Sequence, residues 1–534
     1  MKTTIKNLIL SAVLVVGGAS CVDLDTAPYD RETDLTYWEE DPEAAVKALN
    51  TCYTYLGNMD EQLYCEAMTD NAYTKQPNDA TQNIGNGSYS TADPYVKKVW
   101  DGRYTGIRMC NELLENIDRV PDLDPELKKR YIGEAKVLRA YNYYELYTKF
   151  GDVPYTTKVL SIKESMSIAR TAKATVIANV LADLDEVING NYLPTSYDAD
   201  NKGRITRWAA MAIKAKIYLF EGNWTQVKNI TSTIMTEGGF KLFGSYAGLF
   251  EIANEYNSEV ILDAQYRPTS REHQMMYVFL PPTLGGYSQL SPLQELVDSY
   301  IMLDGKTIKE TGTSFDESHP YANRDPRLKA TVMYTGNSYT LADGTEVVIN
   351  CEKGEGKDGY GVGSDCSATG YYIKKYWDNA YRATLYSGLN PILIRYADIL
   401  LMNAEALAEL GELDKTAWDA TIKPIRDRAG FTLASAVEFP EGASKDKLIE
   451  IVRNERRSEL ALEGHRHKDI IRWRIADDVL NGWCHGLKTN EVVGTDNGYV
   501  RVENRAFNAN KHYLWPITQA ERDLNGNLVQ NPNW

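Results

Sequence analysis

One pattern constrains the fold most: a helix that ends at a glycine and leads directly into a second helix occurs twice. The first copy places Ala215 seven residues before Gly222, and the second places Ala404 seven residues before Gly411. A glycine readily adopts the left-handed conformation that ends a helix, and a small alanine lets the next helix approach closely. Each copy therefore predicts two antiparallel helices joined by a tight turn.

Apolar residues recur at three- to four-residue spacing along much of the chain, which is the period of an amphipathic helix. The pattern predicts helices over residues 128–149, 173–189, 208–221, 225–236, 394–410, 415–429 and 446–463. The two helix–glycine–helix units resemble a tetratricopeptide-type repeat, with a generic helical hairpin as the alternative. The sequence thus predicts a mostly α protein built on helix pairs.

The remaining segments have a different composition. Residues 54–100 and roughly 237–392 are rich in Gly, Asn, Asp, Pro, Ser and Tyr and contain few long periodic runs. Long irregular segments within an ordered chain are more often functional loops than linkers. We expect one domain over 21–534 with a large loop-rich ligand-binding face. Its helical scaffold spans about 40–53, 95–236 and 393–475, and its loop-rich insertion spans about 237–392.

Residues 1–20 indicate a signal peptide, which takes no part in the fold. Lys2 and Lys6 precede a run of nine mainly apolar residues, and small residues then lead into Cys21. The run is too short for a membrane span, which needs ~20 residues. The segment resembles a bacterial lipoprotein signal in which Cys21 is lipidated, with an ordinary cleaved secretory peptide as the alternative. Asp23 and Asp25 resemble a surface-export signal of some Gram-negative lipoproteins.

The composition limits the class of ligand. The 58 Lys and Arg residues stand against 74 Asp and Glu residues, which gives a net charge of −16. Nucleic-acid binding needs a surplus of basic side chains, so we exclude it. The chain has 36 Tyr and 10 Trp but only 10 Phe. Aromatic rings with a polar group are used where a surface faces water, sugars or a partner, and also between packed helices.

Six cysteines remain besides Cys21: Cys52, Cys65, Cys110, Cys351, Cys366 and Cys484. An exported protein can form disulfides, and Cys351 and Cys366 flank a glycine-rich loop that a disulfide would close. The pairing of the six is left open by the sequence. No two of them have CxxC spacing, which argues against a zinc site.

Three local motifs do not support the chemistry that they suggest. Asp198–Gly203 resembles the start of a calcium loop, but Lys202 stands at a ligand position. Gly354–Gly359 matches GxGxxG without a strand–turn–helix context. His465 and His467 lack the spacing of a zinc protease motif. The sequence therefore predicts no metal, no cofactor and no catalytic residue.

An ordered set of motifs extends over the whole mature chain and resembles the SusD/RagB family. The segments that carry the resemblance are Tyr131–Tyr141, Phe150–Pro154, Gly203–Thr206, Asn323–Leu328, Ile394–Ala406, Asn454–Trp473, Leu514–Ile517 and Gln530–Trp534. Each motif alone is weak, but the set in this order is highly specific. The lipoprotein-like start is also a feature of that family.

The resemblance implies an outer-membrane lipoprotein, lipid-anchored and exposed at the cell surface. Such a protein binds a nutrient, usually a glycan or oligosaccharide, and delivers it to a TonB-dependent, SusC-like β-barrel transporter, and it is not an enzyme. A peptide-binding import component is the alternative, and a surface glycosidase is a weaker one. A scaffold for the transporter with a vestigial site is a further alternative.

Many signature residues are charged, and their spacing predicts a structural role. Acidic and basic residues three and four positions apart, among them Glu455, Arg456, Glu459 and Glu463, would pair along one helix. We expect similar pairs of Glu134 with Arg139 and of Arg395 with Asp398 and Glu405. Asp469 and Arg472 are expected to join the network, and Arg324–Arg327 to form a locked turn.

Ligand recognition is expected on the loop-rich face, where rings stack on sugars and polar groups bind their hydroxyls. The candidate ligand-binding residues are Tyr73, Gln76, Asn78, Tyr89, Arg267, Tyr277, Tyr287 and Trp377, with Lys75, His273, Tyr360 and Tyr381 as further candidates. For each ring, packing or contact with the transporter is the alternative. The tryptophans assigned to the core are Trp100, Trp208, Trp224, Trp473 and Trp515.

Overall fold

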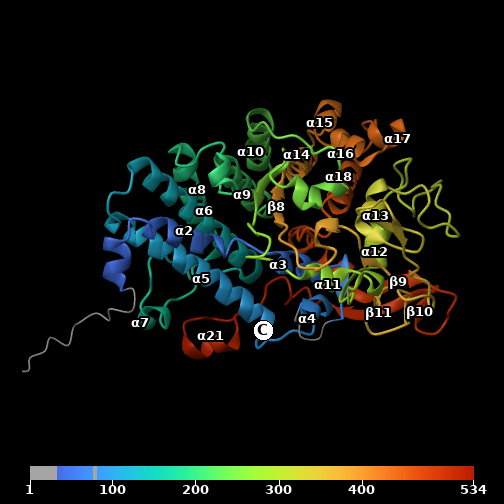
Figure 1. Ribbon diagram of the computed structural model, residues 1–534, viewed down its shortest axis with the longest axis horizontal. Helices are drawn as coiled ribbons and strands as arrows, with labels where there is room; N and C mark the ends of the chain where they lie inside the picture. The colour runs from blue at the N-terminus through green and yellow to red at the C-terminus, as the bar shows by residue number, and fades with distance from the viewer. Residues whose placement is uncertain (1–32, 76–80) are drawn as a thin grey trace, which may run out of the picture.

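The computed structural model describes residues 33–75 and 81–534 (Figure 1). Helices account for 47% and strands for 10% of it, so the protein is mostly α, as predicted. Cys21, Gln76 and Asn78 lie outside the described residues.

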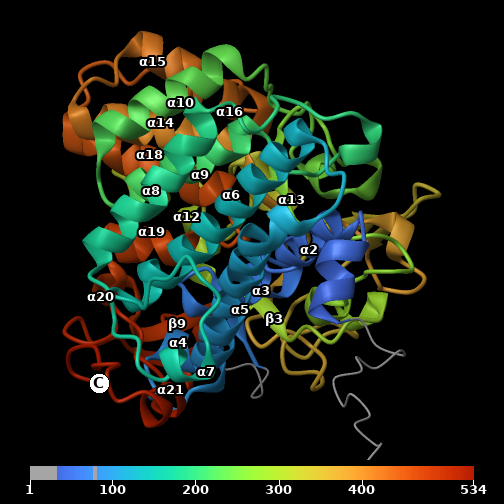
Figure 2. The same ribbon diagram turned by 90° about the vertical axis from the view of Figure 1, so that its left-hand side faces the viewer.

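Long helices form a continuous array from the left to the top of Figure 1. In chain order they are α2 (Ala44–Tyr53), α5 (Pro94–Asn116), α6 (Pro125–Phe150), α8 (Lys173–Asn189), α9 (Arg207–Phe220), α10 (Trp224–Glu237), α14 (Tyr396–Leu410) and α18 (Lys445–Glu459). From α5 onward each helix packs against the next in this order. Seen from the side, α10, α14 and α18 lie together at the top of the molecule (Figure 2).

The two glycines adopt the conformation that the sequence predicts. Gly222 and Gly411 have φ of 70° and 74°. The residue after each glycine donates its backbone N–H back across the turn, from Asn223 to the Tyr218 carbonyl at 2.9 Å and from Glu412 to the Leu407 carbonyl at 2.8 Å. These bonds satisfy carbonyls that the helix end leaves free. The helix–glycine–helix units are therefore confirmed.

Three helix predictions differ from the structure, and one of them is the helix expected over 446–463, because α18 ends at Glu459. Ile394 and Arg395 belong to strand β8 (Ile392–Arg395), which pairs with β2 (Val260–Asp263), so α14 begins only at Tyr396. The helix expected over 415–429 is split into α15 (Lys415–Ala420) and α16 (Ile422–Ala429). The break falls at Thr421, whose φ and ψ of −125° and −71° are not helical.

The insertion is built from short elements, on the right-hand side of Figure 1. They are β2, α11 (Met275–Phe279), β3 (Leu290–Pro292), α12 (Gln294–Ser299), α13 (Pro326–Thr331), β4 (Val332–Met333), β5 (Ser338–Thr340), β6 (Glu346–Val348) and β7 (Tyr372–Ile373). A second hydrophobic core, separate from that of α5–α10, lies beneath them. The irregular segments are thus anchored on a core of their own.

The remaining elements complete the fold around these two parts. They are the short helices α3 (Met59–Tyr64), α4 (Thr81–Asn86), α7 (Ile162–Ser165), α17 (Ala434–Val437), α19 (Arg466–Arg472), α20 (Ala476–Val479) and α21 (Gln519–Leu524), and the strands β1 (Ala72–Thr74), β9 (Asn481–Lys488), β10 (Thr495–Asp496) and β11 (Tyr499–Ala506). Strands β9–β11 form an antiparallel sheet in the order β10–β11–β9. The helical periodicity of the chain gave no indication of this sheet.

The charged signature residues form a buried network, but the predicted pairs within one helix are wrong. Glu459 of α18 pairs with Arg327 of α13 at 2.9 Å and with Arg395 of β8 at 2.6 Å. Arg395 also binds Glu463 at 2.7 Å and Glu259 at 2.7 Å. The partners come from distant segments because α18 is buried between them, so its acidic groups meet guanidinium groups of other elements.

This network joins the insertion to the helical scaffold, since Glu259 and Arg327 belong to the first and Arg395 and Glu459 to the second. Burial alone would raise the pKa of Glu463, but Arg395 and Lys375 outweigh it and hold that pKa at about 2. A buried charge without a partner is strongly destabilising. The network therefore favours one relative placement of the two parts.

The other predicted charge pairs also form with partners different from those expected. Glu134 binds Arg130 at 3.2 Å and Arg204 at 3.0 Å, not Arg139, which pairs with Asp183. The partners predicted for Arg395, which are Asp398 and Glu405 of α14, are wrong as well. Asp398 pairs with Lys216 and Arg456, and Glu405 pairs with Arg472. As expected, Asp469 joins this network through Arg456 and Arg472.

Two further expectations concern cross-links and the membrane. Cys351 and Cys366 are both buried and free in the structure, so no disulfide closes the loop between them. The Cys366 thiol instead donates to the Lys357 carbonyl at 3.3 Å. Among the helices of the described residues, none is long and apolar enough to cross a bilayer.

Candidate functional site

Three tyrosines of the insertion form an aromatic surface, which we call the tyrosine platform: Tyr277, Tyr287 and Tyr386. The rings of Tyr277 and Tyr287 are stacked, with centroids 5.8 Å apart and planes 16° from parallel. Tyr386 meets Tyr277 edge-on, with centroids 5.8 Å apart. Tyr287 and Tyr386 are 47% and 39% exposed, which is unusual for rings of this size. The platform is therefore available to a ligand.

The backbone holds the two stacked rings in place. Tyr277 lies within α11, and after the helix ends at Phe279 the chain turns at Gly285 and Gly286 and returns. The Tyr287 N–H then donates to the Tyr277 carbonyl at 2.8 Å. Gly285 has φ of 87°. A Cβ on Gly286 would lie 2.1 Å from the Leu280 carbonyl oxygen, so only glycine fits there. The sequence thus fixes the spacing of the rings through its turn.

A second backbone contact brings Tyr386 to the same place. His273, just before α11, exchanges two backbone hydrogen bonds with Ser387, at 2.8 and 2.9 Å. His273 itself is buried, and burial lowers its pKa to about 4, so the ring is neutral. Its Nε2 lies 3.2 Å from the Leu389 carbonyl. This candidate therefore positions the platform and does not present itself to a ligand.

Arg267 lies beside the platform, on the loop that precedes His273. A Cβ on Gly388 would meet Arg267 and Pro268 backbone atoms within 3 Å, so this loop packs tightly on the segment that carries Tyr386. The Arg267 side chain is exposed, and among the described residues its guanidinium has no hydrogen-bond partner. Its donors are free to bind hydroxyl groups of a ligand.

Tyr73 and Lys75 lie on a neighbouring strand, with both side chains engaged. Strand β1 pairs with β3, and the Lys75 N–H donates to the Gln289 carbonyl at 2.9 Å. The Tyr73 hydroxyl accepts from Gln82 at 3.3 Å. Lys75 Nζ donates to the Cys366 carbonyl at 2.7 Å. The main chain of this strand adjoins the platform, but these two side chains bind other parts of the protein.

Trp377 lies apart from the three tyrosines, against the β5–β6 hairpin. Its indole N–H donates to the Thr340 carbonyl at 3.3 Å, and its ring meets Tyr339 edge-on at 5.1 Å. Tyr381 is buried and Tyr360 is half-buried. None of the contacts that the structure gives these three rings reaches the platform.

Tyr89 is in the core, which corrects its assignment to the ligand face. It is 4% exposed, and its ring packs against His512 at 5.0 Å and Trp534 at 4.8 Å. Both partners lie at the end of the chain, so no local pattern could reveal the burial. Of the tryptophans assigned to the core, Trp100, Trp208, Trp473 and Trp515 are buried, and Trp224 is half-buried. Trp483, which was not singled out, is 44% exposed.

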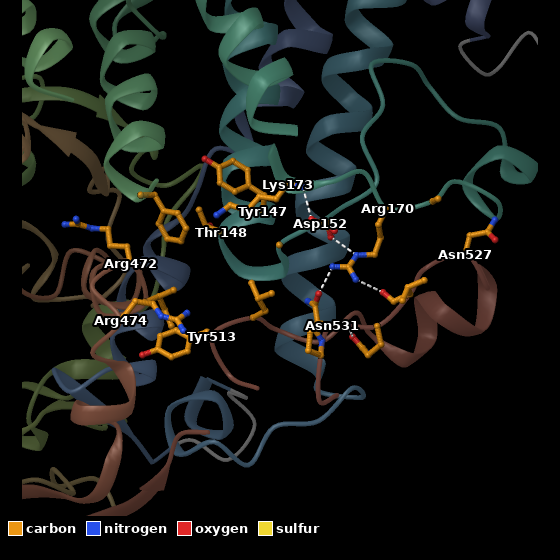
Figure 3. Close-up of a pocket in the computed structure, with 18 residues that line it drawn as sticks. Tyr147, Thr148, Asp152, Arg170, Lys173, Arg472, Arg474, Tyr513, Asn527 and Asn531 are labelled. Atoms are coloured by element: carbon orange, nitrogen blue, oxygen red, sulfur yellow. Dashed lines mark hydrogen bonds between the residues drawn. The ribbon is translucent and has the colours of Figure 1, made fainter. Parts of the chain in front are cut away.

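A cavity of about 810 Å³ lies elsewhere, where α6, the start of α8 and the C-terminal tail meet (Figure 3). Its rings are already covered by cations. The guanidinium of Arg474 lies 3.7 Å over the Tyr513 ring, and Lys173 lies over Tyr147 and Phe220. No ring in this cavity presents the free face that a stacked sugar needs.

Arg170 of the same cavity ties the tail to the scaffold. It donates to the Asp152 carbonyl at 2.8 Å, to the Val529 carbonyl at 2.6 Å and to Asn531 Oδ1 at 2.5 Å, as the dashed lines in Figure 3 show. All of these acceptors are already satisfied by the protein. The cavity is therefore a junction between the chain end and the helices.

The platform suits the capture of a sugar chain. Flat aromatic rings bind the apolar faces of pyranoses, and the free donors of Arg267 bind hydroxyl groups.

Among the described residues, no group of three or more His, Cys, Asp or Glu side chains converges as in a metal site.

Comparison with known proteins now identifies the class. The sequence profile of the SusD family matches residues 249–534, and a second profile, described as starch-binding associating with outer membrane, matches residues 37–219. The first match covers more than half of the chain. The protein therefore belongs to the SusD family.

Relatives cover nearly the whole chain. "SusD-like protein P25" of Formosa agariphila is 28% identical over 515 residues, 89% of this chain and 91% of the relative. The structure of a SusD-like carbohydrate binding protein from Bacteroides fragilis matches with a TM-score of 0.81 at 28% identity, over 92% of this chain and 100% of that one. A laminarin binding SusD-like protein shares the fold, with a TM-score of 0.68 at 24% identity over 92% of this chain and 99% of that one.

Proposed function

We propose that this protein binds a nutrient glycan at the bacterial cell surface and delivers it to a TonB-dependent outer-membrane transporter, without catalysing a reaction. The observation that carries the proposal is the stacked pair Tyr277–Tyr287, in which the Tyr287 ring is 47% exposed. The exposed ring of Tyr287, supported from beneath by Tyr277, offers a flat surface that matches the apolar face of a sugar unit. A peptide ligand would not require rings arranged in this way.

Family membership supports the same role. The relative from Bacteroides fragilis is described as a carbohydrate binding protein, and the second profile is described as associating with the outer membrane. In this proposal a lipid on Cys21 anchors the protein, and the tyrosine platform with Arg267 contacts the glycan. The segment with Gln76 and Asn78, which follows strand β1 in the chain, would extend the contact surface.

A calorimetric screen of the soluble form that starts at residue 22 tests the proposal. The panel contains laminarin, soluble starch, xylan, polygalacturonate, mucin glycans and short peptides. We expect saturable binding of one glycan without product formation, and Tyr287→Ala should weaken it. Tyr256→Ala is the matched control, because Tyr256 is a 40% exposed ring outside the platform. Hydrolysis of the glycan, or binding of peptides alone, would refute the proposal.

A further inference from the structure

A second cavity, separate from the tyrosine platform, lies between α12, α18 and the β9–β11 sheet. Its volume is about 480 Å³, within the range of about 300–1,000 Å³ that is typical of small-molecule sites. Trp483 of β9 lines it, and its ring is 44% exposed. It is the only exposed tryptophan among the residues that the structure describes.

The Trp483 ring is held by a chain of contacts that returns to the cavity. The guanidinium of Arg501 lies 5.5 Å from the ring centroid and donates to Asp496 Oδ1 at 2.9 Å. Asp496 also lies 3.0 Å from His485 Nε2. His485 Nδ1 in turn lies 2.8 Å from Glu295, which lines the same cavity. An exposed ring with this support is pre-organised for binding.

The walls of the cavity provide both donors and acceptors. Its charged side chains are nearly balanced in sign: Asp70, Glu295, Asp298, Asp478, Lys309, Arg457 and Arg505. Among the described residues, the carboxylate of Asp478 has no ion-pair partner, and the ammonium group of Lys309 interacts electrostatically with Asp298 without a direct ion pair. Asp298 accepts a hydrogen bond from Gln294 at 2.7 Å with one oxygen only.

This balance indicates the class of ligand. Asp70 and Glu295 are already bound by Arg457, Arg466 and His485. An anionic ligand such as a phosphate would still meet the carboxylate of Asp478 and the free oxygen of Asp298, which disfavours it. A neutral sugar has many hydroxyl groups that both donate and accept, and an apolar face that an indole covers. The lining therefore matches a neutral pyranose better than a charged ligand.

We propose that this cavity, with Trp483 at its edge, is a second carbohydrate site that binds a neutral sugar unit. The inference rests on the proposed function, because it assumes that the protein captures glycans. Two contact points on one protein raise the affinity for a long polysaccharide above that of either point alone.

Affinity gel electrophoresis in laminarin, soluble starch, xylan and mannan tests the second site. One of these polysaccharides is expected to retard the parent protein. Trp483→Ala should weaken that retention roughly three- to tenfold, the range for loss of one aromatic contact. Trp483→Phe should keep most of it. The Tyr277→Ala/Tyr287→Ala variant should also lose part, and the combination of all three substitutions should lose nearly all retention.

Lys309→Ala provides a second variant in the cavity that leaves the ring in place, and it should weaken retention as well. Tyr256→Ala is the control, and thermal melts verify that each variant is folded. If Trp483→Ala and Lys309→Ala both match the parent while the tyrosine variant is impaired, the second site is disproved and the proposed function stands. If none of the four neutral polysaccharides retards the parent, the second site is disproved, and the proposed function is then decided by polygalacturonate and mucin glycans in the calorimetric screen.

Discussion

The rings of Tyr277 and Tyr287 lie 5.8 Å apart and 16° from parallel, although a turn with two glycines separates them in the chain. The arrangement depends on the backbone hydrogen bond from the Tyr287 N–H to the Tyr277 carbonyl, not on the rings themselves. Loss of one ring should therefore leave the turn intact. Distortion of the turn should separate the rings without removing either.

Gly286→Ala tests this dependence. The new Cβ would lie 2.1 Å from the Leu280 carbonyl oxygen, so the turn must open. We expect glycan binding to weaken at least about tenfold, which is ~1.4 kcal/mol. Thermal unfolding should show a loss of about 1–3 kcal/mol. Calorimetry with the glycan identified in the screen measures the first effect.

Gly102→Ala is the control for a glycine-to-alanine change. Gly102 lies in α5, and the Cβ that alanine would add there has no neighbouring atom within 4 Å among the described residues. A helix interior prefers alanine by roughly 0.5–1 kcal/mol, so this variant should be slightly more stable and bind normally. Unchanged binding in Gly286→Ala would show that the ring spacing does not matter.

The buried network predicts a large loss of stability for Arg395→Met. The substitution leaves Glu259, Glu459 and Glu463 buried with fewer cationic partners. Breaking a buried ion pair from one side typically destabilises by about 3–5 kcal/mol. We expect a loss of that size in denaturant unfolding.

Lys415→Met is the matched control for removal of a charge. Its pair with Asp419 at 2.6 Å is exposed, with 54% and 38% of the two side chains accessible. Exposed pairs contribute up to about 1 kcal/mol, so little change is expected. Equal effects of the two substitutions would contradict a structural role for the buried network.

These partners also show where the sequence stops being informative. Local periodicity predicted α8 over its full length, Lys173–Asn189, and the left-handed conformation of Gly222 and Gly411. Those features depend on neighbours within one or two turns. The partners of Arg395 lie on other elements, so an interpretation by helical spacing assigned them wrongly.

Only part of the candidate site could be predicted, again because contacts distant in sequence leave no local pattern. The resemblance to the SusD/RagB family marked the loops that carry Tyr277 and Tyr287, and the structure brings these rings together with Tyr386, which the sequence did not distinguish. Tyr89 has the same side chain, but the C-terminal Trp534 covers it. Trp483 lies on a strand of a sheet that helical periodicity cannot detect. Exposure of a ring depends on contacts distant in sequence.

His485 predicts a pH dependence of stability. Its hydrogen bond to Glu295, and a further one to Asp496, raise its pKa above the ordinary 6.5. The groups that face it are Glu295 of α12, Asp496 of β10 and Arg501 of β11. Because the folded state holds the proton more tightly, its contribution is complete below pH 6.5 and is lost as the pH rises through the raised pKa.

His485→Gln should remove that dependence. We expect the difference in melting temperature between the parent and this variant to be larger at about pH 6 than at about pH 8.5. Retention by the polysaccharide that retards the parent should weaken over the same interval if the imidazolium helps to hold Trp483. His319→Gln is the control, because the His319 ring is exposed and, among the described residues, is hydrogen-bonded only to Asp316, at 2.8 Å. A constant difference across the pH range would contradict the prediction.

The N-terminal signal predicts two separable effects on location. Cys21→Ala removes the thiol that would carry the lipid, so the protein should move from the membrane fraction to the soluble fraction. Replacement of Asp23 and Asp25 by Ala should leave it in the membrane but protect it from protease added to intact cells. The two variants differ because the anchor and the export signal depend on different residues. Fractionation and protease shaving, with detection by immunoblot, distinguish them. Membrane retention of Cys21→Ala would contradict lipidation at this position, while the form that starts at residue 22 should still bind glycan.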